Sequence, residues 1–233
     1  MRILVVASNS MEFPGILARA NETRNVTASI GFARAARVGG NELLLAANGA
    51  GRSHASAAVD RVLRVFPAEA VVSTGFCGAL RPEMDVADLV VGTAVTSGGR
   101  QYATWPLTAP NRADIHRGVV YTSDRIIQTT DEKAELAKTG AAAVEMEAAG
   151  VAERASSHAL PFSCVKAVTD LASETLFNDY NRALREDGYF DTIVLLRGTL
   201  RQPFVRTQEL LRLRQRCARA AEVLGEFFAD LRF

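Results

Sequence analysis

The 233-residue sequence lacks the features that mark membrane-spanning, nucleic-acid-binding and disulfide-stabilised proteins. It has no run of about 20 apolar residues, so we expect no transmembrane helix. Its 27 Lys and Arg against 26 Asp and Glu leave a formal charge of +1, which offers no general positive field for nucleic acid or an anionic membrane. Only three cysteines are present, without CxxC spacing, and one stays unpaired in any disulfide scheme. These absences indicate a cytoplasmic protein kept in a reducing compartment.

What the sequence does contain is a large apolar fraction arranged in short aliphatic runs. At 48% apolar residues the chain can bury a substantial core, and we favour one α/β domain over two small ones. The aliphatic runs are typical of strands covered on both faces, and the segments between them favour helices. The predicted strands are 3–7, 26–32, 42–47, 70–74, 86–95, 119–123 and 162–169, and the predicted helices are 15–20, 55–66, 131–138 and 144–158.

The stretch from Ala141 to Gly150 sets two carboxylates among small apolar residues. Burying an unpaired carboxylate costs several kcal/mol or forces its pKa up, so Glu145 and Glu147 need a reason to be there. A helix throughout would point them about 200° apart, whereas an extended lead-in would place both on one side and Met146 on the other. The alternative without function is that both glutamates favour the first turn of a helix.

Three carboxylates fall at the ends or beginnings of predicted elements. Glu12 follows the strand 3–7, Glu147 lies in the stretch just described, and Asp170 ends the strand 162–169. Open α/β sheets bind ligands at the carboxyl ends of their strands, so we expect these side chains to converge on one rim. For Glu12, a favourable position in the first turn of a helix is an equally good explanation. Lys166 inside the last strand is unusual.

Two glycine-containing turns follow predicted strands. Gly75 and Gly78 bracket Phe76-Cys77, where glycines let the backbone come close to another group, so this turn is a candidate pocket floor. The turn 48–54 could present backbone N–H groups to an anion with help from Arg52, although two glycines there are also explained by tight geometry alone.

The remaining segments are less regular. Residues 97–118 show no clear period and are predicted to be a long loop, either a lid or a partner contact. Residues 174–205 are an unassigned insertion. Residues 205–231 repeat apolar side chains every three or four positions, which predicts an amphipathic C-terminal helix docked on the domain, with its arginines on a solvated face.

Several of these pieces together resemble the nucleoside phosphorylase and nucleosidase superfamily. Glu12, the segment 74–79, the Val-Glu-Met-Glu-Ala block at 144–148 and Val168-Thr169-Asp170 occur in the family's order, over roughly residues 1–172. The sequence looks most like the methylthioadenosine/S-adenosylhomocysteine nucleosidases. The resemblance implies a phosphorylase/hydrolase-like fold over residues 1–233: one three-layer α/β/α domain around a central mixed, mostly parallel sheet, with the C-terminal helix added.

The resemblance also implies roles for individual residues. Glu12 would be the general base for the attacking water, and Asp170 the general acid toward N7 of the departing purine. Glu147 would bind the 2′ and 3′ hydroxyls of the ribose. The remaining substrate-binding positions would be Met146 against the sugar, Phe76 near it, the backbone of Ile127 at the adenine edge, Thr169 where the family usually has Ser, and Lys166 where it commonly has Arg.

This set of residues also makes chemical sense without the family. Breaking an N-glycosidic bond develops positive charge on the ribose and negative charge on the base, so a carboxylate below the sugar and an acid at the base act where charge appears. Asp170 would have to hold its proton near neutral pH, which requires apolar or carboxylate-rich surroundings.

The choice of nucleophile rests on missing arginines. Phosphorylases of the superfamily hold phosphate with arginines near residues 9–12 and 73–74, and this chain has none there, which favours water. Arg52, Arg81 or Lys166 could still hold phosphate, so a phosphorylase remains open, including one acting on an adenosyl group with a lipid-like tail. Futalosine hydrolase and a non-catalytic nucleoside-binding protein are further alternatives. We expect a small-molecule nucleoside as the partner, no metal, no cofactor other than phosphate as a co-substrate, and a homo-oligomer, with a dimer favoured.

Overall fold

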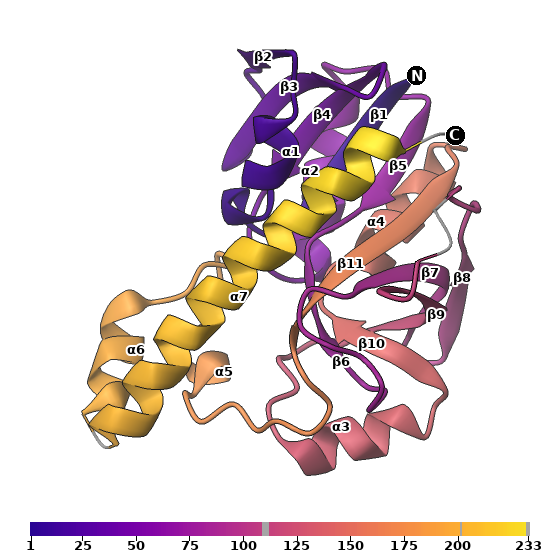
Figure 1. Cartoon of the computed structure of the whole chain (residues 1–233). Coiled ribbons are helices and arrows are strands. Elements are labelled where there is room, and N and C mark those ends of the chain that lie inside the picture. The colour runs from indigo at the N-terminus through magenta and orange to yellow at the C-terminus, as the bar shows by residue number, and fades with distance from the viewer. Residues whose placement is uncertain (109–111, 201, 232–233) are drawn as a thin grey trace.

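The computed structural model describes residues 1–108, 112–200 and 202–231 (Figure 1). Its strands are β1 (Arg2–Ala7), β2 (Glu22–Asn25), β3 (Phe32–Val38), β4 (Asn41–Ala47), β5 (Ala70–Ser73), β6 (Phe76–Ala79), β7 (Leu89–Ser97), β8 (Arg100–Ala103), β9 (Ile115–Thr122), β10 (Ala141–Glu145) and β11 (Phe162–Asp170). Its helices are the 3-10 turn η1 (Ser10–Glu12), α1 (Pro14–Ala18), α2 (Arg52–Leu63), α3 (Thr130–Ala137), α4 (Ala148–Ser157), α5 (Tyr180–Ala183), α6 (Thr192–Thr199) and α7 (Pro203–Asp230). The fold is mixed α/β with a central sheet.

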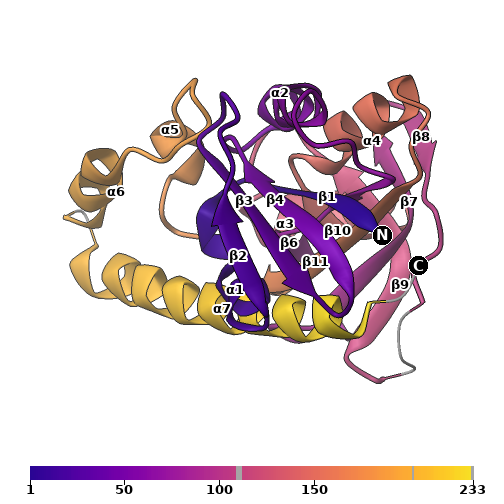
Figure 2. The same ribbon diagram turned by 90° about the horizontal axis from the view of Figure 1, so that it is seen from above.

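Strand β1 lies in the middle of the first half of the sheet, between β4 and β5 and parallel to both. Its side chains alternate between two cores: Leu4 and Val6 pack on one face, and Ile3 and Val5 on the other. Helices α2 and α4 lie over the first face, and α1 and α7 over the second (Figure 2). Both faces are covered, which explains why the strand is aliphatic throughout instead of alternating apolar and polar.

The second half of the sheet closes on itself, because β11 pairs with three different strands. Residues Phe162–Cys164 pair with β5, whereas the later part of β11 pairs with β6 on one side and β7 on the other. The pairings β6–β10, β10–β9 and β9–β7 complete the ring. This closed, barrel-like half is not foreseen by the sequence, which predicts an open sheet.

Two predicted segments are wrong. Residues 26–32 are not a strand, since β2 ends at Asn25 and β3 begins at Phe32, and the two form an antiparallel edge pair instead. The predicted loop 97–118 contains β8 and the start of β9 at Ile115, while its residues 109–111 lie outside the described part of the chain. The hairpin β7–β8 uses Gly98 and Gly99, both with positive φ, for its turn.

Helix α7 spans the molecule from the sheet to a projecting hairpin. Its C-terminal half packs on α1, where a Cβ on Gly15 would lie 2.0 Å from the Ala221 carbonyl oxygen, so the two helices touch backbone to backbone. Its N-terminal end pairs with α6, and together they project away from the sheet, at the end of the molecule opposite both termini (Figure 1). None of the helices within the described residues combines the length and apolarity needed to cross a membrane.

Candidate active site

A cavity of about 380 Å³ opens where β1, β10 and β11 end and β6 begins. The three carboxylates predicted to converge, Glu12, Glu147 and Asp170, all line it. The other cavity-lining residues from the predicted set are Phe76, Ile127, Met146 and Thr169. The convergence expected from the strand ends is therefore confirmed, although the catalytic and binding roles of these residues stay predictions.

Glu12 is held by backbone and hydroxyl donors directly after β1. Its Oε2 accepts hydrogen bonds from the Ser8 N–H (2.8 Å) and the Asn9 N–H (3.1 Å), and its Oε1 from the Ser8 hydroxyl (3.2 Å) and the Phe76 N–H (3.3 Å). The side chain thus closes a capping box on its own turn, which confirms the structural interpretation, and it also faces the cavity, as a catalytic role would require. Burial raises the pKa of Glu12 above its ordinary value, against the opposing charge of Lys166.

Gly75, in the turn after β5, and Gly78, inside β6, let two of the carboxylates approach the backbone. A Cβ on Gly75, whose φ is +115°, would lie 2.8 to 3.0 Å from the Glu12 carboxylate atoms. A Cβ on Gly78 would lie 2.8 Å from Oδ2 of Asp170. The expectation that these glycines permit a close approach is confirmed, and the groups that approach are the protein's own carboxylates.

The stretch Ala141–Gly150 is extended through Glu145 and becomes helical at Ala148, so the predicted helix from 144 begins too early. Glu145 serves structure: its Oε2 accepts from the N–H groups of Glu147 (3.0 Å) and Ala148 (2.9 Å), which caps α4, and its Oε1 accepts from the Thr122 hydroxyl (2.6 Å). The extended lead-in also leaves Met146 and Glu147 lining the cavity.

Glu147 lies between the cavity and the turn 48–54. Its Oε1 accepts a hydrogen bond from the Gly51 N–H at 2.9 Å, so the anion that this glycine turn receives is the glutamate itself. Burial, followed by the charges of Glu145 and Glu12, raises the pKa of Glu147 to about 8, although Lys166 opposes the shift.

Lys166 does not line the cavity, contrary to its prediction as a substrate-binding residue. Its side chain is fully buried behind the glutamates, with Nζ 2.7 Å from the Thr74 carbonyl oxygen, 2.8 Å from Glu145 Oε2 and 3.9 Å from Glu147 Oε2. Burial alone would lower the pKa of Lys166, but Glu145 and Glu147 raise it. The lysine therefore supplies a fixed positive charge beneath the carboxylates.

Asp170 and Thr169 both line the cavity because β11 is irregular at this point. The register against β6 shifts between Val168 and Asp170, and such a bulge breaks the alternation that would send neighbouring side chains to opposite faces. The apolar or carboxylate-rich surroundings expected for Asp170 are wrong in one respect: Nζ of Lys133 lies 2.6 Å from its Oδ2.

Lys133 is the residue that sequence reasoning missed. It lies on α3 with a fully buried side chain, and besides Asp170 its Nζ donates to the carbonyl oxygens of Leu171 (2.7 Å) and Glu174 (3.1 Å). All three ammonium hydrogens thus have acceptors, which fixes Oδ2 of Asp170, while its Oδ1 accepts a hydrogen bond from the Thr169 hydroxyl at 3.3 Å. Its neighbours in sequence are polar and give no sign that this lysine is buried.

The far side of the cavity is mainly apolar. Its residues lie beyond position 172, outside the part of the sequence that resembles the nucleosidases. The unassigned insertion and α7 contribute this wall, and Glu209 fastens the two together. Its buried carboxylate accepts hydrogen bonds from the N–H groups of Phe177 (2.5 Å) and Asn178 (3.0 Å) and from the Tyr180 hydroxyl (3.1 Å). The apolar wall residues are Leu176, Tyr180, Phe190, Leu195, Leu210, Leu213 and Cys217, and Gly188 and Arg214 line the same side.

The arginines on α7 are not all on a solvated face. Arg216 binds both carboxylate oxygens of Glu174, at 2.6 and 2.8 Å, and also donates to the Thr169 carbonyl oxygen at 3.3 Å. It therefore ties α7 to the end of β11, immediately before Asp170. The prediction of a solvated arginine face is wrong for this residue.

The basic residues considered for phosphate are engaged elsewhere. The Arg52 guanidinium binds Glu153 (2.7 Å) and the Tyr102 hydroxyl (2.9 Å), and Arg81 donates to the Arg117 carbonyl oxygen (3.4 Å). Neither lines the cavity. Across residues 1–108, 112–200 and 202–231 there is also no group of three or more His, Cys, Asp or Glu side chains placed to hold a metal ion.

Comparisons with known proteins show the family and the fold. A family model described as "Phosphorylase superfamily" matches residues 2–114 and 106–188. A 5'-methylthioadenosine/S-adenosylhomocysteine nucleosidase from Exiguobacterium sp. is 27% identical over 165 residues, which cover 59% of this chain and 71% of the relative.

Two solved structures show a similar fold. The 5'-methylthioadenosine/S-adenosylhomocysteine nucleosidase of S. pneumoniae, bound to the transition-state inhibitor MT-ImmA, has a TM-score of 0.74 at 18% identity, with 99% of each chain covered. The futalosine hydrolase of Helicobacter pylori has a TM-score of 0.70 at 15% identity, with 97% of each chain covered.

Proposed function

Because this chain belongs to the phosphorylase superfamily, we propose that it is a nucleosidase that hydrolyses the N-glycosidic bond of an adenosine-type nucleoside. The observation that carries the proposal is the meeting of Glu12, Glu147 and Asp170 in one cavity. The products are the free base and a ribose derivative.

Each carboxylate acts where the reaction develops charge. Glu12 takes a proton from water as the oxygen adds to C1′, and its raised pKa brings its basicity closer to working pH. Glu147 binds the ribose hydroxyls, with Met146 and Phe76 beside the sugar. The C1′–N9 bond breaks with its electrons moving to the base, N7 takes up a proton from solvent, and the Asp170 carboxylate, held by Lys133 and Thr169, accepts the hydrogen bond from the protonated N7.

Lys166 takes a positioning role in place of the predicted contact with substrate. It holds Glu145, and Glu145 in turn caps α4 beside Glu147. Ile127 lies in the segment after β9, which Asn181 clamps through two hydrogen bonds of 2.8 Å to the backbone of Ile126. That clamp supports the Ile127 backbone as the contact for the adenine edge.

Water is the nucleophile, and the 5′ substituent of the substrate is apolar. Arg52 and Arg81 are bound to other groups and Lys166 is buried under the glutamates, which leaves no cluster of these three for phosphate. Of the two arginines that line the cavity, Arg125 is paired with Glu132 at 2.7 Å, and Arg214 belongs to the wall on α7. The wall from residues 176–217 provides apolar surface beyond the carboxylates, which suits a methylthio group better than a free hydroxyl.

The test is base release from adenosine, methylthioadenosine, S-adenosylhomocysteine, inosine and futalosine, each with and without phosphate. We expect free sugar without phosphate, fastest for methylthioadenosine, and a fall of about 10²- to 10⁴-fold in Glu12→Gln. Sugar 1-phosphate formed only with phosphate would make the chain a phosphorylase instead. Turnover of futalosine alone would assign it to the futalosine hydrolases.

Asp170→Asn separates an enzyme from a non-catalytic binder. An enzyme variant loses turnover and keeps affinity for a nucleoside analogue, measured by calorimetry. If the unaltered protein binds the analogue and turns over none of the five substrates, the binding function replaces the nucleosidase.

We also propose that residues 1–233 act as one three-layer α/β/α catalytic domain, in the cytoplasm, as a homodimer. The cavity draws on segments from Ser8 to Cys217, which supports a single catalytic unit. The three buried cysteines are free thiols, which suits a reducing compartment. Light scattering during size-exclusion chromatography tests the dimer, and a monomer mass at micromolar concentration contradicts it.

A further inference from the structure

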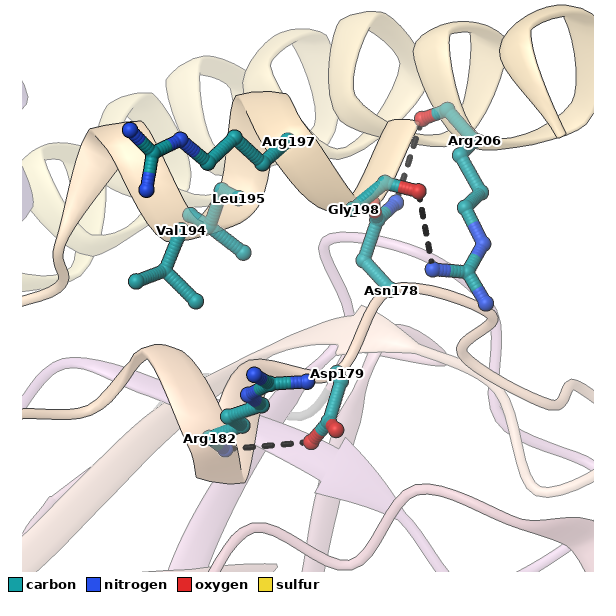
Figure 3. A pocket seen from close by; sticks show the side chains of 8 residues that line it. All are labelled: Asn178, Asp179, Arg182, Val194, Leu195, Arg197, Gly198 and Arg206. Carbon is teal, nitrogen blue, oxygen red and sulfur yellow. Dashed lines mark hydrogen bonds between the residues drawn. The ribbon is translucent and has the colours of Figure 1, made fainter. Parts of the chain in front are cut away.

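A second cavity, of about 210 Å³, lies between α5, α6 and the start of α7 (Figure 3). Its polar side chains are those of Asn178, Asp179, Arg182, Arg197 and Arg206. Three arginines (+3) and one aspartate (−1) give this lining a formal charge of +2, whereas the 233-residue chain as a whole carries +1. The cavity therefore gathers positive charge in a molecule that is otherwise close to neutral.

Arg206 is fixed at this cavity by the hairpin of α6 and α7. Its Nη1 donates to the Gly198 carbonyl oxygen at 3.0 Å (Figure 3). Its Nε is buried and has no acceptor among residues 1–108, 112–200 and 202–231. A buried N–H of a charged group that has lost its hydrating water and gained no acceptor is destabilising. An anion in the cavity would supply an acceptor for it.

Asn178 offers the opposite kind of group. It is 1% exposed, and its Nδ2 donates to the Arg206 carbonyl oxygen at 3.1 Å and to Glu209 Oε1 at 2.7 Å. Turning the amide round would set Oδ1 against these two acceptors, so its orientation is fixed. Oδ1 is buried and accepts no hydrogen bond from the described part of the chain. A ligand that satisfies both side chains must therefore carry an acceptor for Arg206 and a donor for Asn178.

The two other arginines of the cavity differ in direction. In Figure 3 the Arg182 side chain lies on the side of α5 that faces α6, whereas the Arg197 guanidinium extends along α6, away from Arg206. Asp179 is engaged locally, because its Oδ1 accepts a hydrogen bond from the Arg182 N–H at 3.0 Å and caps α5. Arg182 can therefore contact a ligand together with Arg206, and Arg197 adds charge at the rim of the cavity.

We propose that this cavity binds hydrogen phosphate at a site separate from the nucleoside cavity. The charged oxygens of the anion accept hydrogen bonds from Arg206 Nε and from Arg182, since guanidinium groups match phosphate oxygens in geometry and charge. Its one P–OH group donates to Asn178 Oδ1. A carboxylate or a sulfate would satisfy the arginines and leave Asn178 without a donor. The two negative charges of hydrogen phosphate also match the +2 of the lining.

Leu195 links this site to the proposed active site, because it lines both cavities. Phosphate held by α5 and α7 would brace α6 and so fix Leu195 in the apolar wall. We expect KM for methylthioadenosine to fall about fivefold when phosphate is bound, while the product stays free sugar. This consequence rests on the proposed nucleosidase activity, whereas the binding itself does not.

The experiment is isothermal titration calorimetry of the full chain in phosphate-free buffer at pH 8, with inorganic phosphate, sulfate and methyl phosphate as the three titrants. Inorganic phosphate keeps one P–OH group at this pH. Sulfate has no O–H group, and a phosphomonoester has lost its proton, because its second pKa is about 6. We expect one phosphate bound per chain and an affinity for each of the other two anions that is weaker by about tenfold or more.

Arg182→Gln and Arg206→Gln should each weaken phosphate binding about tenfold or more, because each removes a charge-assisted hydrogen bond. The matched control is Arg219→Gln, which changes the net charge equally at an exposed residue of α7 outside the cavity and should bind phosphate as before. Arg182→Gln leaves the contact between Arg206 and Gly198 in place, so its effect is separate from any loosening of the hairpin.

A nucleoside analogue that saturates the active site should leave the affinity for phosphate unchanged, and displacement of phosphate by the analogue would overturn the proposal. So would the absence of phosphate binding, an equal affinity for sulfate, or unchanged binding in both Arg182→Gln and Arg206→Gln. Phosphate binding at this site without turnover of any nucleoside would refute the proposed nucleosidase and leave the phosphate site standing.

Discussion

The two ends of the cavity are built in different ways. At the polar end, Glu12, Glu147 and Asp170 each lie at a strand end, and each is held by backbone groups or a buried lysine. At the apolar end, the wall comes from two loops and three helices between Leu176 and Cys217, fastened by Glu209. At the polar end each carboxylate lies on or soon after a strand and is held by groups from neighbouring elements, whereas the apolar end depends on how two later segments pack.

The difference suggests a division of labour. The three carboxylates proposed to carry the chemistry, whose positions must be precise, lie at rigid strand ends. The apolar wall, which would set substrate preference, belongs to elements that can vary without moving the carboxylates. Changes at the polar end should therefore lower turnover for every substrate. Changes at the apolar end should alter which substrate is preferred.

The largest effect is expected at Lys133, the buried lysine that binds Asp170 at the polar end. Lys133→Met removes one partner of a buried ion pair and leaves Asp170 and two carbonyl oxygens without their donor. We expect the free energy of unfolding to fall by about 3 to 5 kcal/mol, measured by urea denaturation. Turnover should fall for all nucleosides at a temperature where the variant is folded.

The control for that change is Lys138→Met, on the residue that follows the same helix and is 72% exposed at its side chain. Its stability should stay within about 0.5 kcal/mol of the unaltered protein. If both variants lose the same stability, Lys133 has no special part in holding Asp170.

A smaller effect is expected where the backbone touches a carboxylate. Gly75→Ala strains a residue at φ +115° and pushes a methyl group against Glu12, so turnover should fall about 100-fold. Gly40→Ala, at φ +84° with nothing within 4 Å of the new methyl group, gives a similar backbone strain without a carboxylate nearby. Equal turnover in the two variants would show that Glu12 tolerates displacement.

The smallest effect is expected at the apolar end. Leu213→Ala removes part of the wall, so KM for methylthioadenosine should rise about tenfold while kcat and the KM for adenosine change little. Leu211→Ala, on the same helix and 56% exposed, is the matched control. A fall in kcat that is equal for both substrates would remove the distinction between the two ends.

Sequence reasoning was most successful where function depends on position along a strand. The aliphatic runs ended where the strands end, so Glu12 and Asp170 could be placed beside a cavity before any coordinates were known. It failed for Lys133, because its partner lies 37 residues further along the chain and nothing in the local pattern marks the contact. It also misjudged Lys166, whose charge is used beneath the glutamates and not on a ligand.

The sequence by itself determined the α/β class, most of the central strands, the long C-terminal helix and three carboxylates on one rim. These follow from local periodicity and from the rule that parallel strands end at one edge. Only the tertiary structure decided the closure of the second half of the sheet, the partner of Asp170 and the use of residues 174–217 as a wall. These three features depend on which segments, distant in sequence, come into contact. The packing of the whole core sets those contacts, and the spacing of residues along the chain does not reveal them.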